Sequence, residues 1–170
     1  MSRSTIPEVT VYVGLGSNLE NPIHQIQKAI LALDNIPETS LVSHSSLYQS
    51  KPMGPADQSD YINSVAELST SLSSLALLDQ LQDIENAQGR IRKTEKWGAR
   101  TLDLDLLLYA NQISSTPRLT IPHYGIKERL FVLLPLIEIA PTLRLPDNSQ
   151  LSDLVKHLTT DQSSQEIHKL

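Results

Sequence analysis

The stretch RTLDLDLLLY, residues 100–109, alternates leucine with aspartate in its first half. In a β-strand successive side chains point to opposite faces, so the even-numbered leucines share one face and Asp103 and Asp105 share the other. In a helix the two aspartates would lie about 200° apart around the axis. The stretch alone fits two interpretations equally well. It is either an ordinary half-exposed strand with a polar outer face, or a strand that carries a metal-binding pair of carboxylates.

Hydrophobic periodicity predicts five elements before this strand. They are a strand at 9–13, a helix at 22–35, strands at 41–49 and 61–69, and a helix at 73–88. The order β-α-β-β-α-β indicates an α+β protein with a ferredoxin-like sandwich, in which helices pack on an antiparallel sheet. We interpret GLGSN, residues 14–18, as a tight turn between the first strand and the first helix, because it lacks the lysine of a P-loop and the third glycine of a dinucleotide-binding motif.

Two further helices are predicted after the aspartate-bearing strand. The first spans 127–134 and ends at Pro135, since proline disrupts a helix interior, and the second lies near 151–158. The tail 161–170 has no clear packing partner, so we expect it to fray. Without an internal repeat or a long linker, residues 1–170 are expected to form one domain with C-terminal additions.

The composition excludes several classes of protein. Hydrophobic residues make up 39% and charged residues 19%, as in a globular protein. The net charge of -5 argues against a general nucleic-acid binder. The absence of cysteine excludes disulfides, thiolate metal sites and cysteine nucleophiles. No segment is long and apolar enough for a membrane span, and the N-terminus lacks the apolar core of a signal peptide, so we expect a cytoplasmic protein.

A basic loop leads directly into the two aspartates. Its cations are Arg90, Arg92, Lys93, Lys96 and Arg100, with Glu95 as the one acidic residue. A charged loop is usually only solvated. Beside a carboxylate pair, however, such a cluster suits a polyphosphate with Mg²⁺, since arginines bind phosphate oxygens and Mg²⁺ needs only one or two carboxylates besides the phosphates.

Aromatic residues are scarce, at 4% of the chain, and one of them is paired with an amide. Tyr61 and Asn63 share one face of the strand at 61–69, where a flat heterocycle could stack on the ring while the amide reads its polar edge. Trp97 in the basic loop and Phe131 are further candidates for stacking. Either Tyr61 or Phe131 alone would be more simply explained as a core residue.

Three blocks of the sequence resemble one enzyme family. They are PMGPADQSDYIN at 52–63, GRIRKTEKWGARTLDLDLLLY at 89–109 and LTIPHYGIKERLFVLLPLIEIAP at 119–141. The sequence from Val11 to Pro146 resembles the 6-hydroxymethyl-7,8-dihydropterin pyrophosphokinases of folate biosynthesis. The resemblance implies an ATP-dependent pyrophosphokinase that transfers pyrophosphate from ATP to the pterin hydroxymethyl group and releases AMP.

The resemblance also implies a role for individual residues. Asp103 and Asp105 would hold two Mg²⁺ ions, with Arg90, Arg92 and Arg100 on the phosphates. The ATP site would consist of Gln82, Glu85, Arg100, Leu106, Arg118, Thr120, His123, Tyr124 and Arg129. The pterin site would consist of Ser50, Lys51, Met53, Tyr61, Asn63, Trp97 and Phe131. The expected partners are these two small molecules, with no nucleic acid and no membrane, and the expected state is a monomer.

Two alternatives come from other functional classes. A different Mg²⁺-dependent nucleotidyl- or phosphotransferase would explain the carboxylate pair but not the pairing of Tyr61 with Asn63. An RNA-binding module on the same sandwich would need a basic, aromatic sheet face, whereas two aspartates repel phosphate unless a metal intervenes. The acceptor of the hydroxyl proton stays open between an aspartate and water.

Overall fold

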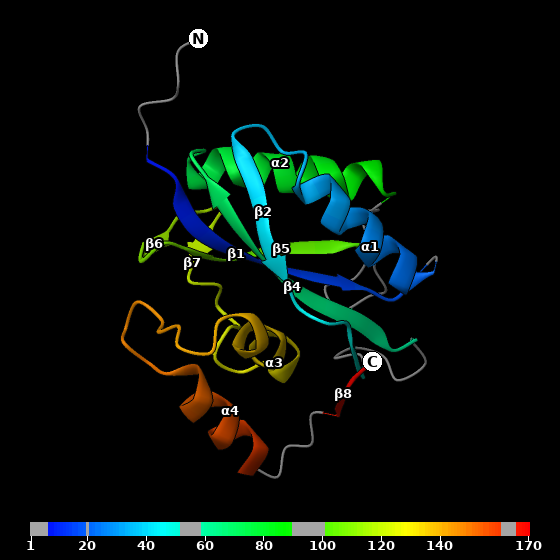
Figure 1. Ribbon diagram of the computed structural model, residues 1–170, viewed down its shortest axis with the longest axis vertical. Coiled ribbons are helices and arrows are strands. Elements are labelled where there is room, and N and C mark those ends of the chain that lie inside the picture. The colour runs from blue at the N-terminus through cyan, green and yellow to red at the C-terminus, as the bar shows by residue number, and fades with distance from the viewer. Residues whose placement is uncertain (1–6, 20, 52–58, 90–100, 161–165) are drawn as a thin grey trace.

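An antiparallel sheet runs through the molecule, with helices on both of its faces (Figure 1). The computed structural model describes residues 7–19, 21–51, 59–89, 101–160 and 166–170. Its elements are β1 (Val9–Ser17), α1 (Pro22–Leu33), β2 (Thr39–His44), β3 (Tyr48–Ser50), β4 (Tyr61–Thr70), α2 (Ser74–Ala87), β5 (Asp103–Tyr109), β6 (Ser114–Ser115), β7 (Thr120–Ile121), α3 (Leu130–Ile139), α4 (Leu151–Thr160) and β8 (Ile167–Lys169).

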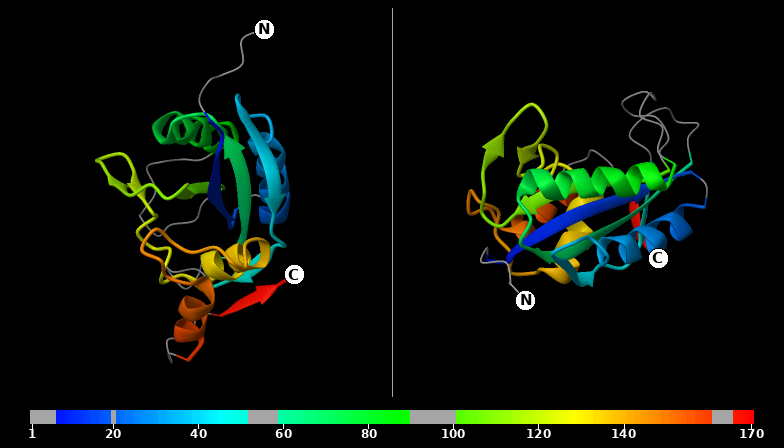
Figure 2. Two further views of the ribbon diagram at one scale, coloured as in Figure 1. Left: turned by 60° about the vertical axis from the view of Figure 1, so that its left-hand side comes forward. Right: turned by 90° about the horizontal axis from the view of Figure 1, so that it is seen from above.

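The strand order confirms the ferredoxin-like sandwich. The main sheet has the order β5-β1-β4-β3-β8, with β2 also paired to β4, and each of these pairs is antiparallel. A separate small hairpin joins β6 to β7. The helices α1 and α2 lie along one side of the sheet and α3 lies on the other, with α4 packed against it (Figures 1 and 2).

Local sequence signals explain where α1 and α2 begin and where α2 ends. Pro22 occupies the first turn of α1, where its missing N–H costs nothing. The hydroxyl of Ser73 caps α2 by accepting a hydrogen bond from the Ala76 backbone N–H at 3.1 Å. Gly89 follows the end of α2 with a φ of 88°, a conformation that glycine adopts without strain.

Each face of the sheet buries its own hydrophobic core. The first core lies under α1 and α2 and contains alternate residues of β1 and β4, among them Val13 and Leu68. The second lies between the sheet and α3, where Val65 and Leu133 are fully buried. Because both faces are covered, the central strands are fixed in position and can present polar side chains at their ends.

The predicted turn at GLGSN is wrong, because β1 continues through it to Ser17. Gly14 is paired on both sides, to Val65 and Asp105, and Gly16 is paired to Asn63 and Asp103. Glycine weakens a strand in isolation. Here β1 is an interior strand, and hydrogen bonds to both neighbours outweigh the low strand propensity of glycine.

The predicted shared face of the four leucines is only partly correct. Leu102, Leu104 and Leu106 lie in the first core, but Leu108 lies in the second. The reason is a register shift: Val13 pairs with Leu106 and Tyr12 with Leu108, which leaves Leu107 as an extra residue. Such a β-bulge reverses the alternation of side chains beyond it. Both aspartates precede the bulge and keep a common face.

Two other predicted elements are corrected by the structure. The strand at 41–49 is divided into β2 and β3, because Ser45 leaves the ladder and its hydroxyl bonds to the Val65 N–H at 3.0 Å. The helix expected to end at Pro135 instead contains it, since α3 starts only at Leu130 and burial in the second core offsets the lost hydrogen bond.

The end of the chain also differs from the expected frayed tail. Residues Ile167–Lys169 form β8 and pair with β3, with Gln49 opposite His168. An edge strand such as β3 offers unpaired backbone groups to which a further strand can add. The preceding residues 161–165 lie outside the described part of the chain. No helix in that described part is long and apolar enough to cross a membrane.

Candidate active site

Cross-strand pairing places the predicted metal-binding and heterocycle-binding residues on one face of the sheet. Asp103 on β5 is opposite Gly16 on β1, and Gly16 is opposite Asn63 on β4. Residues directly opposite each other project to the same face. With strands about 4.8 Å apart, Asp103 and Asn63 are separated by two strand spacings, about 10 Å. The row therefore brings an acidic group and an amide within reach of one small ligand.

Gly16 keeps the space between Asp103 and Asn63 free of a side chain of its own. A Cβ at this position would lie 3.5 Å from Asn63 Oδ1 and 3.7 Å from Tyr61 Cδ1. The sequence pattern gave no role to this glycine beyond a turn. The signal that could have revealed it is the spacing of two between Gly14 and Gly16, which puts both glycines on one face of an extended strand. In the structure this face of β1 is the one on which the two aspartates of the neighbouring β5 lie.

Asp105 faces His123 at the edge of this surface. The two groups lie 4.0 Å apart, Nε2 to Oδ2, and the aspartate side chain is 47% exposed. His123 Nδ1 accepts a hydrogen bond from the Gly125 N–H at 3.1 Å, so a neutral ring carries its proton on Nε2. Burial, with a smaller contribution from the Arg129 charge, lowers the pKa of His123 to about 4. At neutral pH the ring is therefore a neutral donor beside Asp105.

The segment after β7 is fixed to the aspartate-bearing strand. The His123 N–H donates to the Leu107 carbonyl at 3.0 Å. The Tyr124 ring stacks on His123 with centroids 4.5 Å apart, and the Arg129 guanidinium lies 5.2 Å from the Tyr124 centroid and 5.7 Å from that of Phe131. These contacts bring four of the predicted ligand-binding residues together, and Arg129 links the predicted ATP and pterin residues.

Glu85 supports the strand between the two aspartates. It is 2% exposed, and its Oε2 accepts a hydrogen bond from the Leu104 N–H at 2.8 Å. Because β5 is an edge strand of the sheet, its outward N–H groups need partners from elsewhere. The structure thus gives Glu85, predicted from the family resemblance to belong to the ATP site, a direct role in fixing the backbone between Asp103 and Asp105.

Arg118 and Gln82 come together at the surface beside the β6–β7 hairpin. Arg118 Nη2 donates to Asp79 Oδ1 at 2.7 Å and to Gln82 Oε1 at 3.4 Å. Asp79 was not predicted, although its spacing of three from Gln82 puts both on one face of α2. Thr120 is exposed on β7, whereas the Leu106 side chain is buried in the first core. A nucleotide contact at Leu106 would therefore come from its backbone.

The predicted pterin residues of β3 and β4 are in contact. Asn63 Nδ2 donates to Ser50 Oγ at 2.7 Å, and both residues are buried. This bond leaves the amide oxygen and one N–H of Asn63 for other partners. Tyr61 is opposite Ser50 in the strand register, so its ring projects to the same face.

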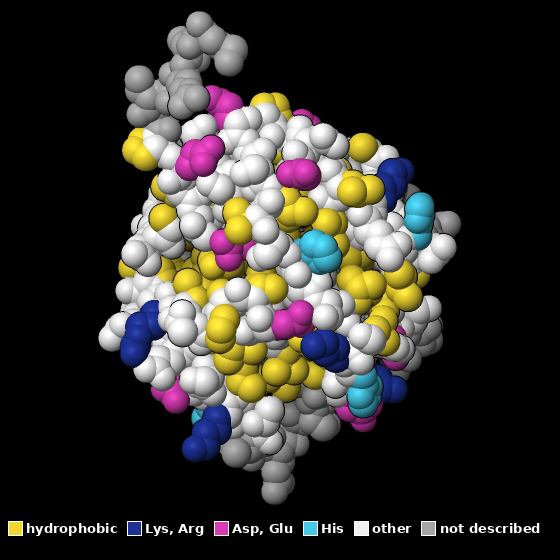
Figure 3. Space-filling model, in the orientation of Figure 1, with side chains coloured by type: hydrophobic (Ala, Val, Ile, Leu, Met, Phe, Trp, Pro, Cys, Tyr) yellow, Lys and Arg dark blue, Asp and Glu magenta, His cyan; other side chains and the backbone are white. Residues whose placement is uncertain are grey.

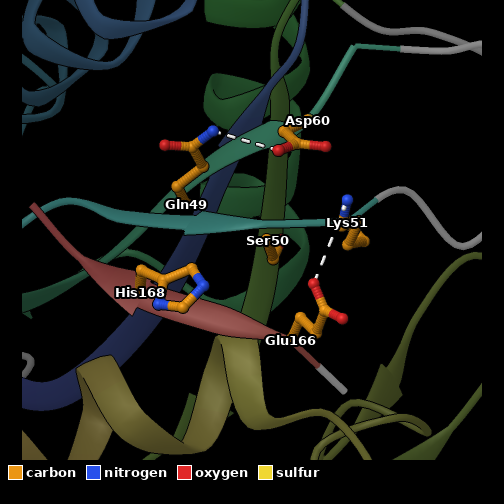
Figure 4. A pocket seen from close by; sticks show the side chains of 6 residues that line it. All are labelled: Gln49, Ser50, Lys51, Asp60, Glu166 and His168. Atoms are coloured by element: carbon orange, nitrogen blue, oxygen red, sulfur yellow. Dashed lines mark hydrogen bonds and ion pairs between the residues drawn. The ribbon is translucent and has the colours of Figure 1, made fainter. Parts of the chain in front are cut away.

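Lys51 contacts Glu166, the residue that precedes β8. Its ammonium group lies 3.9 Å from Glu166, and its N–H donates to the Glu166 carbonyl. Figure 4 shows the pocket at this sheet edge, which is lined by Gln49, Ser50, Lys51, Asp60, Glu166 and His168. The pocket adjoins the pterin residues through Ser50.

Several predicted residues lie outside the described part of the chain and remain predictions. They are Met53, Arg90, Arg92, Lys93, Lys96, Trp97 and Arg100. Among the described residues no group of three or more His, Asp or Glu side chains is placed to hold a metal ion. A carboxylate pair nevertheless fits Mg²⁺, which takes its remaining ligands from substrate phosphates and water.

Charges of both signs are interspersed on the face of the molecule seen in Figure 3. Acidic, basic and histidine side chains are spread over that face among hydrophobic and neutral atoms. A nucleic-acid-binding domain typically gathers its lysines and arginines in one patch or stripe. This face therefore gives no support to the alternative of an RNA-binding module.

Comparison with known proteins identifies a matching family. Residues 12–141 match the family model described as 7,8-dihydro-6-hydroxymethylpterin-pyrophosphokinase (HPPK). The 2-amino-4-hydroxy-6-hydroxymethyldihydropteridine pyrophosphokinase of Haemophilus influenzae is 53% identical over 148 residues, which cover 87% of this chain and 92% of that protein. The enzyme of the same name from Pseudomonas aeruginosa is 54% identical over 145 residues, or 85% and 89% of the two chains.

Solved structures share the fold at low sequence identity. The HPPK-DHPS protein of Plasmodium falciparum matches with a TM-score of 0.72 and 13% identity, over 93% of this chain. The chain spans 44% of that longer protein, so this likeness concerns the fold alone. The family model and the two bacterial relatives together show that the chain belongs to the 7,8-dihydro-6-hydroxymethylpterin pyrophosphokinase family.

Proposed function

We propose that Asp103 and Asp105 hold two Mg²⁺ ions for the reaction that this ATP-dependent pyrophosphokinase catalyses. The reaction is the transfer of pyrophosphate from ATP to the hydroxymethyl group of 6-hydroxymethyl-7,8-dihydropterin, with release of AMP, in folate biosynthesis. The observation that carries the assignment is the row Asp103–Gly16–Asn63 on one sheet face. It sets an acidic group about 10 Å, two strand spacings, from a buried amide on the same face, with a glycine on the strand between them.

The carboxylate pair fits the chemistry of pyrophosphate transfer. Mg²⁺ held by Asp103 and Asp105 would supply positive charge that neutralises the phosphate oxygens during transfer. The chain supplies two carboxylates that share a face and a strand whose backbone is held by Glu85. These residues therefore hold the two carboxylate charges in position before the substrates bind. Less rearrangement of the charged groups is then needed to reach the transition state.

The ATP site lies on the side of Asp105. His123 offers a neutral N–H donor there, and the guanidinium groups of Arg118 and Arg129 stand on the adjoining segments. Donors and cations of this kind suit phosphate oxygens and a ribose. We assign Arg90, Arg92 and Arg100 to the phosphates as well, on the basis of the family resemblance.

The pterin site lies on the side of Asn63. The amide of Asn63 is held by Ser50 and reads the polar edge of the heterocycle, while the rings of Tyr61 and Phe131 stack on its faces. The hydroxymethyl group then extends over Gly16 toward Asp103. Binding both substrates on one rigid sheet face converts their encounter into an oriented, effectively unimolecular step.

We also propose that the chain acts as a monomer on small molecules in the cytoplasm. The described residues assigned to the two substrates all belong to one chain, on β3, β4, α2, β5, β7, the segments flanking β7 and the start of α3. A catalytic unit of this kind needs no residue from a second subunit. Neither a nucleic acid nor a membrane is required by the assigned site.

Identification of the products tests the assigned reaction. With ATP, Mg²⁺ and the reduced hydroxymethylpterin, the chain is expected to form AMP and pterin diphosphate in equal amounts, as measured by chromatography. A pterin that lacks the hydroxyl group is the control and should give no AMP. Formation of ADP, or ATP turnover that does not depend on the pterin, would contradict the assignment.

A further inference from the structure

Glu138, near the C-terminal end of α3, gathers donors from three separate elements. Its Oε2 accepts hydrogen bonds from the Ser46 N–H at 2.9 Å and from the Ser46 hydroxyl at 3.0 Å. Its Oε1 accepts one from the Tyr48 hydroxyl at 2.5 Å and lies 3.9 Å from the ammonium group of Lys169 on β8. These four residues, Glu138, Ser46, Tyr48 and Lys169, are here called the Glu138 network.

The charge state of the network favours these contacts. Burial alone would raise the pKa of Glu138, but hydrogen bonds from Tyr48 and Ser46, with the charge of Lys169, lower it overall. Burial, together with the Glu138 carboxylate, raises the pKa of the Tyr48 hydroxyl. At neutral pH an ionised carboxylate therefore faces a protonated phenol, and such charge-assisted hydrogen bonds are stronger than neutral ones.

The elements joined by the network carry opposite walls of the pterin site. On α3, Phe131 precedes Glu138 by seven residues, about two helical turns or 10 Å. On β3, Tyr48 precedes Ser50 by two residues and projects to the same face. Tyr48 is also directly opposite Asn63, which Ser50 holds. The network thus sets the spacing between the α3 wall and the wall formed by β3 and β4.

We propose that Glu138 is a positioning residue for the pterin substrate. It touches neither substrate. It holds α3 against β3. Before the pterin binds, Phe131 is therefore already at the distance from Ser50 and Asn63 that the bound heterocycle requires. The proposal rests on the assignment of those residues to the pterin site. Preset walls improve affinity because less conformational freedom is lost when the ligand binds.

The expected signature is a selective loss of pterin affinity. Glu138→Ala should raise the dissociation constant of the pterin about tenfold, within the range found for coupled neighbouring residues. The dissociation constant of a nonhydrolysable ATP analogue should change less than about twofold, because Asp105 and His123 are held by β5 and not by the network. Isothermal titration calorimetry measures both, and the KM for the pterin should rise more than kcat falls.

A second tyrosine–glutamate pair provides the matched control. Glu67, four residues beyond Asn63 on β4, accepts a hydrogen bond from the Tyr12 hydroxyl of β1 at 3.1 Å. Glu67→Ala removes the same kind of bond and should leave pterin affinity unchanged. Glu138→Gln keeps an acceptor for one donor, so its pterin affinity should lie between those of wild type and Glu138→Ala.

Tyr48→Phe tests the proposal with a milder change. It deletes one hydroxyl and should raise the pterin dissociation constant about threefold. In the double variant, adding Tyr48→Phe to Glu138→Ala should have little further effect, because the two residues belong to one network. Unchanged pterin affinity in folded Glu138→Ala and Tyr48→Phe would overturn the proposal, and so would an equal loss in Glu67→Ala. If wild type itself fails to bind the pterin, the site assignment is overturned together with the proposal.

Discussion

Replacing Asp103 or Asp105 by asparagine is expected to lower kcat about a thousandfold or more. Asparagine keeps the size and the hydrogen-bonding oxygen but removes the charge that holds Mg²⁺. Losing one such ligand removes electrostatic stabilisation of the transferring phosphates, for which effects of about 10² to 10³ per group are usual. Steady-state rates over a range of Mg²⁺ concentrations measure the effect.

The fold should survive both substitutions. Both aspartate side chains are only partly buried, and neither belongs to a hydrophobic core. Circular dichroism and thermal unfolding should match wild type. Asp153→Asn, on the exposed side of α4, is the control and should keep the full rate. Near-normal Mg²⁺-dependent rates in both site variants would show that the pair is only the polar face of a strand.

Asn63→Leu is expected to weaken pterin binding about a hundredfold while ATP binding is unchanged. Leucine is similar in size but can neither donate nor accept, so the polar edge of the bound heterocycle would lose its partners in a dry site. Ser50 would also lose the hydrogen bond it accepts. Fluorescence titration with the pterin and calorimetry with an ATP analogue separate the two affinities.

A buried serine on the other face of the same strand controls for general damage to β4. Ser64 is 1% exposed and its hydroxyl lies 3.0 Å from that of Ser45. Ser64→Ala should therefore leave pterin affinity within about twofold of wild type, as expected for a site away from the ligand. An equal loss of affinity in Ser64→Ala, or none in Asn63→Leu, would remove Asn63 from the pterin site.

The core of the fold was predictable because alternation and helical periodicity directly report which side chains are buried. The shared face of Asp103 and Asp105 followed from the two-residue repeat of a strand. The pairing of Tyr61 with Asn63 followed in the same way. These features depend on neighbours in the sequence, which is why they could be read from it.

The remaining features depend on partners that are far away along the chain. The bulge at Leu107 is defined by the register against β1, and Gly16 became part of the site only through its two neighbouring strands. Strand β8 needs the open edge of β3. Glu138 meets Ser46 across 92 residues, and no local pattern marks that contact.

The central claim is that the metal ions and the pterin bind on one face of the sheet, over β5 and β4, with only β1 between them. Mn²⁺ accepts the same oxygen ligands as Mg²⁺ and is paramagnetic. Nuclear relaxation of the bound pterin protons, measured with Mn²⁺ and a nonhydrolysable ATP analogue, therefore reports the separation. We expect strong relaxation corresponding to about 10 Å or less, two strand spacings, and its loss in Asp103→Asn. A bound pterin whose relaxation is the same with Mn²⁺ as with Mg²⁺ would contradict the account.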